Sequence, residues 1–167
     1  MVFELIVYNI ASVNGKVCAL GQRNCRFQNI TDDIIHCKTG NTCSYSNLDA
    51  TGFIRCAADD SCFKAKSIKA GADISCERGQ SCKQVTGNIQ TTNGSILCPG
   101  KESCKRVQGD IIASQDIICG DRSDSDKGKY SCTDSTLSAT DVYCEGEYSC
   151  QYGSIDASNN IYFKSLS

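Results

Sequence analysis

The stretch Ile74-Ser-Cys-Glu-Arg-Gly-Gln-Ser-Cys82 decides the fold, because close copies of it recur along the whole chain. Most copies hold an apolar residue two positions before a first cysteine, and a second cysteine follows six or seven residues later or, once, after a longer insertion. The fourteen cysteines form seven such pairs: Cys18/Cys25, Cys37/Cys43, Cys56/Cys62, Cys76/Cys82, Cys98/Cys104, Cys119/Cys132 and Cys144/Cys150. Self-similarity with a period of about twenty residues indicates a solenoid or another repeat architecture.

The residues around each pair predict short strands. Two positions before the first cysteine, or before Phe163, stand Lys16, Ile35, Ile54, Ile74, Ile96, Ile117, Val142 and Ile161. After the second cysteine comes a second apolar position, occupied by Ile30, Leu48, Ile68, Ile89, Ile111, Leu137 and Ile155. Apolar residues that alternate over three or four positions, interrupted by Gly, Asn, Asp and Ser, favour strands and corners over helices.

We therefore predict an all-β chain, a parallel β-solenoid with three short strands in each coil. Strand connections of this kind are nearly always right-handed, so a right-handed β-helix is expected. The pattern predicts about eight partial or complete coils in one domain that spans residues 1–167. A segment of a longer repeat array is an open alternative.

The cysteines indicate a disulfide framework. Such a density implies either an oxidising compartment or a metal-thiolate protein, but the chain has one His and no Cys-x-x-Cys motif. We therefore expect no metal and no other cofactor. Stacked coils align seven first cysteines in one column and seven second cysteines in another. Pairing along a column would leave one thiol over in each, whereas pairing within coils uses all fourteen, so we predict a bridge inside each coil.

Other features fit an extracellular or cell-surface protein. The first ten residues, MVFELIVYNI, lack a basic segment and a cleavage site, so we do not interpret them as a signal peptide. No run of eighteen apolar residues occurs, so no membrane span is expected. Asn93 and Asn29 begin N-glycosylation triplets, and Asn93 is the better candidate because Asn29 adjoins an apolar strand position.

Serine precedes the second cysteine in five pairs, at Ser61, Ser81, Ser103, Ser131 and Ser149. The repeated phrase Ile/Val-x-Cys-x4-Ser-Cys, followed by a further Ile or Leu, resembles the cysteine-rich solenoid repeats of large secreted and surface proteins of protists. The resemblance covers nearly the whole chain. It implies an extracellular structural role in surface coats or filaments, and it assigns no functional residues.

The two ends of the repeat suggest self-association. Phe3 and Phe163 replace cysteine at the two boundaries, and no capping helix is evident beside them. Solenoids normally need polar caps, because otherwise the last coil exposes apolar residues and unpaired backbone groups. We expect end-to-end stacking of copies, or continuation into adjoining repeats. The alternative is that the two phenylalanines are hydrophobic lids on a monomer.

A second surface follows from the outward positions between the isoleucine and cysteine columns. Leu97, Ile118, Tyr143 and Tyr162 form an apolar stripe there, and Tyr130 and Tyr148 lie two residues before a second cysteine. Exposed apolar patches often mark contact surfaces, here for lateral association or for glycan binding. The alternative is a ladder of side chains that only stabilises the sheet locally.

Acidic residues offer a weaker, enzymatic hypothesis. Asp116 and Asp141 should stack on neighbouring coils with Asp73 in the same column, as acid and base or as calcium ligands would. Corner aspartates that face solvent are the commoner explanation, and the acidic insertion 121–128 lacks the spacing of a calcium loop. We expect a structural module that forms a fibre, filament or coat, with a glycan-binding or adhesion module second and a polysaccharide-active enzyme a distant third. With a net charge of −2 and no basic stripe, nucleic acid is not expected as a partner.

Overall fold

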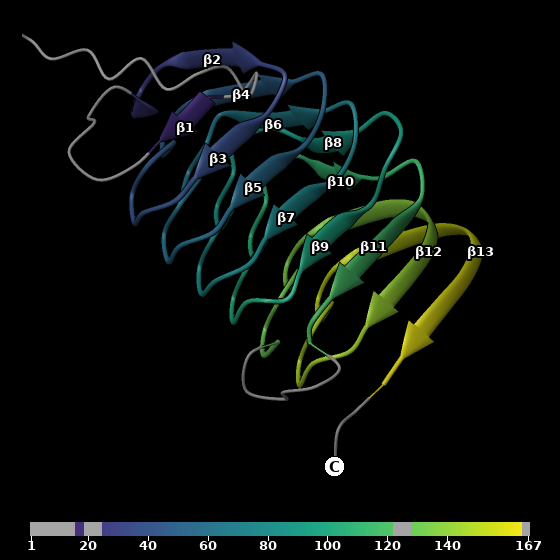
Figure 1. Cartoon of the computed structure of the whole chain (residues 1–167). Helices are drawn as coiled ribbons and strands as arrows, with labels where there is room; N and C mark the ends of the chain where they lie inside the picture. The colour runs from purple at the N-terminus through teal and green to yellow at the C-terminus, as the bar shows by residue number, and fades with distance from the viewer. Residues whose placement is uncertain (1–15, 19–24, 122–127, 165–167) are drawn as a thin grey trace, which may run out of the picture.

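The computed structural model describes residues 16–18, 25–121 and 128–164 of the chain. They form a parallel β-solenoid of about seven turns with about 20 residues per turn, as Figure 1 shows. The thirteen strands are β1 (Lys16–Cys18), β2 (Asn29–Asp32), β3 (Ile35–Cys37), β4 (Asn47–Ala50), β5 (Ile54–Cys56), β6 (Ser67–Ala70), β7 (Ile74–Cys76), β8 (Ile89–Thr91), β9 (Ile96–Cys98), β10 (Asp110–Ile112), β11 (Asp116–Cys119), β12 (Thr136–Cys144) and β13 (Ser154–Phe163).

The strands lie on two sides of each turn. The odd-numbered strands β1 to β11 pair with one another in sequence, and so do the even-numbered strands β2 to β10 (Figure 1). β12 pairs with both β10 and β11, so one long strand bends from one side to the other, and β13 follows it. The expectation of three strands per coil was therefore wrong, since most described coils have two, whereas the expected eighth coil includes residues before Lys16 that lie outside the described part of the chain. The right-handed winding stays a prediction.

The core consists of the predicted columns. Isoleucine and cysteine point inward from the short odd-numbered strands β3 to β11, and Ile35, Ile54, Ile74, Ile96 and Ile117 are fully buried. Register pairs such as Ile54 with Ile74 and Cys56 with Cys76 place like residues on one another in successive turns. Burying one such side chain contributes about 1.5–3 kcal/mol, so a narrow core of stacked isoleucines supplies much of the stability.

The third side of each turn is made of overlapping tight turns rather than a strand. In one coil three four-residue turns overlap within 58–65, each closed by an N–H that donates to the carbonyl three residues earlier. Asp60, Cys62 and Lys64, the third residues of these turns, have φ of 52° to 58°, as type II turns require. The equivalent residues in the other coils also have positive φ: Asn41, Cys43, Tyr45, Gln80, Cys82, Gln84, Glu102, Cys104, Arg106, Tyr130, Cys132, Asp134, Tyr148, Cys150 and Tyr152.

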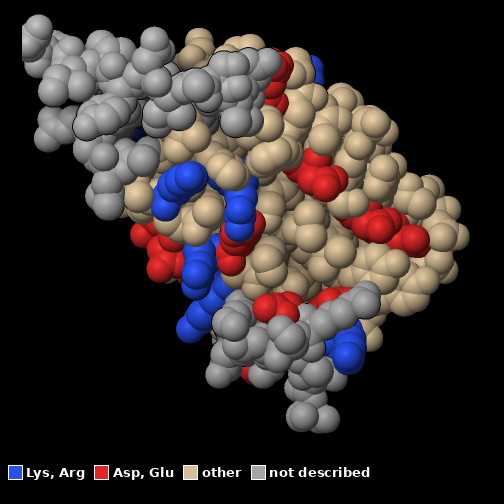
Figure 2. Space-filling view, viewed as in Figure 1, with Lys and Arg blue, Asp and Glu red and all other residues tan. Residues whose placement is uncertain are grey.

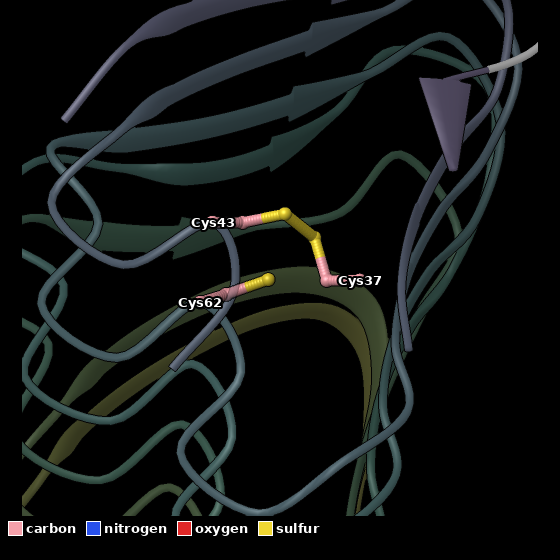
Figure 3. A group of neighbouring side chains, drawn as sticks. All are labelled: Cys37, Cys43 and Cys62. Carbon is pink, nitrogen blue, oxygen red and sulfur yellow. A yellow bond between two sulfur atoms is a disulfide. The ribbon is translucent and has the colours of Figure 1, made fainter. Parts of the chain in front are cut away.

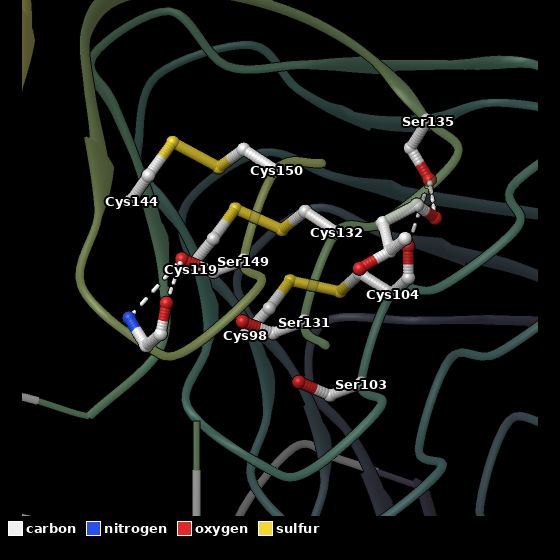
Figure 4. Close-up of a disulfide and its surroundings, with 12 residues drawn as sticks. Cys98, Ser103, Cys104, Cys119, Ser131, Cys132, Ser135, Cys144, Ser149 and Cys150 are labelled. Atoms are coloured by element: carbon white, nitrogen blue, oxygen red, sulfur yellow. Dashed lines mark hydrogen bonds between the residues drawn. A yellow bond between two sulfur atoms is a disulfide. The ribbon is translucent and has the colours of Figure 1, made fainter. Parts of the chain in front are cut away.

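The recurring serine belongs to this corner. The Ser81 hydroxyl donates to the carbonyl of Arg78 at 2.7 Å, and the Ser103 hydroxyl donates to Gly100 at the same distance. Figure 4 shows Ser103, Ser131 and Ser149 stacked in this position beside the disulfides. A hydroxyl in this position therefore closes the turn that presents the second cysteine.

All fourteen cysteines are paired within their coils, as predicted. The seven bridges have Cα–Cα distances of 5.9 to 6.1 Å, and no cysteine is free. Cys119–Cys132 closes the neck of the long insertion with the same Cα–Cα distance of 5.9 Å as Cys144–Cys150 (Figure 4). The bridge therefore fixes the corner whatever the length of the loop outside it.

Candidate interaction surfaces

The predicted outward column is present on the odd-numbered side. Its members pair in register through successive strands, in the order Val17, His36, Arg55, Ser75, Leu97, Ile118, Tyr143 and Tyr162. The Tyr143 and Tyr162 rings stack with centroids 4.7 Å apart and planes 6° apart. Leu97, Ile118 and Tyr143 are half-buried and line an open groove of about 510 Å³. The C-terminal half of the column is thus a continuous apolar stripe.

After Val17, the N-terminal half of the same column is polar, with His36, Arg55 and Ser75. Arg55 Nη2 donates to Glu77 Oε2 at 2.8 Å. His36 packs edge-on against Phe53, and among the described residues its Nε2 has no hydrogen-bond partner. Burial, and then the charges of Arg55 and Lys38, lower the pKa of His36. The column therefore changes character along the rod, and only its C-terminal half resembles a contact surface.

Acidic groups border the apolar stripe. Asp116, Asp121 and Glu145 line the same groove as Leu97 and Ile118. Figure 2 shows acidic side chains scattered over a largely uncharged face. The groove thus offers an apolar floor beside carboxylates.

Tyr130 and Tyr148 meet at the turn corner of the last two coils. Their rings stack with centroids 5.1 Å apart and planes 12° apart. Lys129 Nζ lies 5.6 Å from both centroids and 2.7 Å from Glu147 Oε2. The hydrogen bond from Lys129 lowers the pKa of Glu147, and the hydrogen bond to Glu147 raises the pKa of Tyr148. The two stacked tyrosine rings thus lie at the surface beside the Lys129–Glu147 ion pair.

A charged cluster continues this corner toward the N-terminus. Glu102 accepts hydrogen bonds from Lys83 at 2.7 Å and from Lys105 at 2.9 Å. The bond from Lys83, aided by Lys105 and opposed by burial, lowers the pKa of Glu102 to about 2. The basic and acidic charges at this corner pair with one another.

The C-terminal end exposes residues that belong to core columns. Val142 and Cys144 in β12 are 0% and 3% exposed, whereas their register partners Ile161 and Phe163 in β13 are 43% and 72% exposed. β13 pairs with β12 and, among the described residues, with no second strand (Figure 1). The last coil therefore presents an uncovered apolar edge, and Phe163 occupies the cysteine column as predicted.

Backbone groups at the same end lack the partners that earlier coils have. The N–H of Tyr130 donates to the carbonyl of Glu147 in the following coil, 3.0 Å away. Tyr148 holds the equivalent position in the last coil, and no described coil follows it. A pocket of about 480 Å³ opens there, lined by Tyr148, Phe163 and the backbone around Gly146.

The N-terminal end differs. Cys18 and Cys25 are fully buried in the first described coil, and Ile30 is 6% exposed. Phe27 is exposed at a turn corner, but it stacks on Tyr45 at 4.9 Å beneath the Arg26 guanidinium. Phe3, the other predicted end contact, lies outside the described residues. Apolar core columns are thus open at one end of the described solenoid only.

Two of the three aspartates in the predicted acidic column, Asp73 and Asp141, accept hydrogen bonds at a corner. Asp116 and Asp141 pair in register as expected. Asp141 Oδ1 accepts from the N–H of Asn160 at 2.8 Å, and Asp73 Oδ1 accepts from the N–H of Ser95 at 2.8 Å. Asp73 and Asp141 therefore accept a backbone hydrogen bond from the next coil, which gives them a structural role.

Sulfur atoms of neighbouring bridges lie close together. Cys37, Cys43 and Cys62 have their Sγ atoms within 4.8 Å of one another, and Figure 3 shows Cys62 beside the bridge of the preceding coil. Metal ligation requires thiolates, whereas all these sulfurs belong to disulfides. The triads reflect the stacking of one bridge on the next.

The two glycosylation candidates lie at the surface. Asn93 is exposed in a corner, and Asn29 is exposed but accepts a hydrogen bond from Asn47 Nδ2 at 2.7 Å. Glycosylation of either stays a prediction. The Phe27–Tyr45 stack was missed, although aligning the residues two places after each second cysteine would have revealed it.

Within the described ranges, no helix has the length and apolar character needed to cross a membrane. Comparisons with family models, with curated proteins and with solved structures found no match to this chain.

Proposed function

We propose that this protein is an extracellular structural module, a disulfide-stapled rod that associates through its C-terminal end and builds a fibre, filament or surface coat. The single observation that carries the proposal is the exposure of Ile161 and Phe163, whose partners Val142 and Cys144 are buried. An uncovered strand edge with apolar residues is a template for another chain.

The rest of the molecule supports a mechanical role. Seven bridges, and one parallel sheet that follows two sides of each turn along the whole described length, make a rod of regular cross-section. Seven disulfides are consistent with a secreted protein, since such bonds persist in oxidising environments. The apolar stripe of Leu97, Ile118, Tyr143 and Tyr162 offers a second contact, through which rods joined at their ends could pack side by side.

Sedimentation velocity over a range of concentrations tests the proposal, with Ile161→Asp as the disrupting variant. A carboxylate at the open edge should prevent association, because burying an unpaired charge is costly. Ile112→Asp is the matched control: Ile112 is a half-buried outward residue on β10, which is separated from β13 by β12 and is not at the open edge. We expect the wild type and Ile112→Asp to associate and Ile161→Asp to remain monomeric. A wild type that is monomeric at every concentration would contradict the proposal.

A further inference from the structure

We propose that two copies join tail to tail, with β13 of one copy antiparallel to β13 of the other around a two-fold axis at Asn159. This inference rests on the proposed function, and it names the partner and the symmetry of the end contact. A contact of this kind is isologous, so it closes a dimer.

The two ends of the described solenoid differ in a way that disfavours the simplest alternative, head-to-tail stacking. Such stacking would bring the N-terminal side of the solenoid onto β13 of another copy. The apolar residues Cys18, Cys25 and Ile30 of the first described coil are already buried, so they offer little new area. Lys16 pairs in register with Ile35, so a lysine rather than an isoleucine holds this column position in the first described coil.

The strand β13 is complementary to itself. Inward positions along it are Ile155, Ala157, Ile161 and Phe163, because these residues pair with inward residues of β12. An antiparallel copy centred on Asn159 sets Ile155 opposite Phe163 and Ala157 opposite Ile161. Every inward residue therefore meets an inward apolar residue of the other copy.

One extra residue in β13, relative to β12, allows the two-fold axis to pass through Asn159. The register with β12 shifts between Ala139 and Asp141, so that β13 holds one more residue than β12 at the bend. Three residues separate Ala157 from Ile161, and Asn159 is the middle one. An odd number of intervening residues places one residue on the axis, and here that residue is an exposed asparagine rather than a charge.

The outward side of the pairing is also favourable. Asp156 would lie opposite Tyr162 of the other copy and diagonal to its Lys164. Diagonal neighbours on paired strands are about 7–8 Å apart, within reach of a lysine. Asp156 is the one charged residue within β13, so the antiparallel edge brings no like charges into register.

The strand is also long and unprotected. β13 has 10 residues and, between Ser154 and Phe163, neither proline nor lysine. Natural edge strands that remain unpaired are usually short or carry such residues. The length and composition of this edge therefore fit a strand that is covered by a partner.

Cysteine cross-linking tests the symmetry. Asn159→Cys should give a disulfide-linked dimer under mild oxidation, since the two-fold axis brings this residue next to its own copy. Asn93→Cys is the matched control, because Asn93 is also an exposed corner asparagine but lies in the middle of the rod. Non-reducing gels and intact-mass measurement should show the dimer for Asn159→Cys and loss of that dimer when Ile161→Asp is added.

The outcomes separate the two proposals. In sedimentation, the smallest species that Ile161→Asp abolishes should have twice the chain mass of 18.0 kDa. A smallest associated species other than a dimer, or association without any cross-link at Asn159→Cys, overturns the two-fold pairing and leaves the proposed function standing. A wild type that never associates overturns both.

Discussion

Removing a bridge from the middle of the ladder should cost more stability than removing the terminal bridge, although the two close rings of the same length. We compare Cys76→Ala/Cys82→Ala with Cys144→Ala/Cys150→Ala. Both bridges have a sequence separation of 6. Loop-closure entropy therefore assigns about 2 kcal/mol to each.

Packing makes the difference. Both middle cysteines are fully buried, and Cys76 Sγ lies within 4.8 Å of sulfurs in the bridges on either side. The terminal cysteines are 3% and 7% exposed and have a described bridge on one side only. Deleting a fully enclosed sulfur should cost roughly 1 kcal/mol in lost contacts and cavity formation. The middle pair should then lose about 4 kcal/mol and the terminal pair about 2–3 kcal/mol.

Urea unfolding followed by circular dichroism measures the two losses. The coils of a solenoid are coupled mainly to their neighbours and do not always unfold in one step. Hydrogen exchange should therefore accompany the urea experiment, to show which coils open. The middle variant should lose protection on both sides of its coil, and the terminal variant only in the last coils. Equal losses, or a larger loss for the terminal pair, would refute the argument that neighbouring bridges stabilise one another.

Two further predictions concern the turn corner. Gln80 is exposed with φ 59°, a conformation that costs a non-glycine residue about 1–2 kcal/mol. Gln80→Gly should therefore raise the free energy of unfolding by roughly 0.5–1 kcal/mol, once the larger backbone entropy that glycine loses on folding is subtracted. Gln80→Val should lower the free energy of unfolding, because a β-branched residue tolerates positive φ poorly. The opposite order of the two variants in urea titrations would show that the corner is not strained. The second concerns pH: because the pKa of Glu102 falls from 4.5 to about 2 on folding, its ion pairs stabilise fully above pH 4.5 and are lost as the pH falls toward 2. Glu102→Gln should cost on the order of 1 kcal/mol at neutral pH and flatten the unfolding midpoint over that range, and an unchanged acid slope would contradict the assignment.

The repeat in the sequence was enough to predict the two strand columns and the disulfide pairing. Each Ile-x-Cys unit fixes which residues point inward, since side chains alternate along a strand. Each column holds seven cysteines, so pairing along a column would leave one thiol unpaired in each. Pairing within coils uses all fourteen, and this count predicted the bridges without any knowledge of distances. Those predictions depend on the periodicity of the sequence. Because the chain contains seven copies of the motif, this periodicity can be recognised from the one sequence.

The third side of the coil could not be predicted in this way. Gln80, Tyr130 and Arg106 adopt positive φ although none is glycine, so their identities carry no signal of that conformation. It is imposed by hydrogen bonds to neighbouring coils, which exist only once the coils stack. The Asp73 and Asp141 carboxylates were ambiguous for the same reason, because their partners are backbone groups about twenty residues away in the next coil.

The short loop that each disulfide closes affects the order in which the disulfides can form. Six bridges join cysteines 6 or 7 residues apart, and the seventh joins cysteines 13 apart. Short loops close at low entropic cost, so under oxidising conditions both thiols of a ring can meet as soon as they emerge in a nascent chain. Oxidation can proceed from the amino end onward without waiting for distant partners. A polypeptide stapled in this manner can be elongated by one more unit without reshuffling any earlier bond.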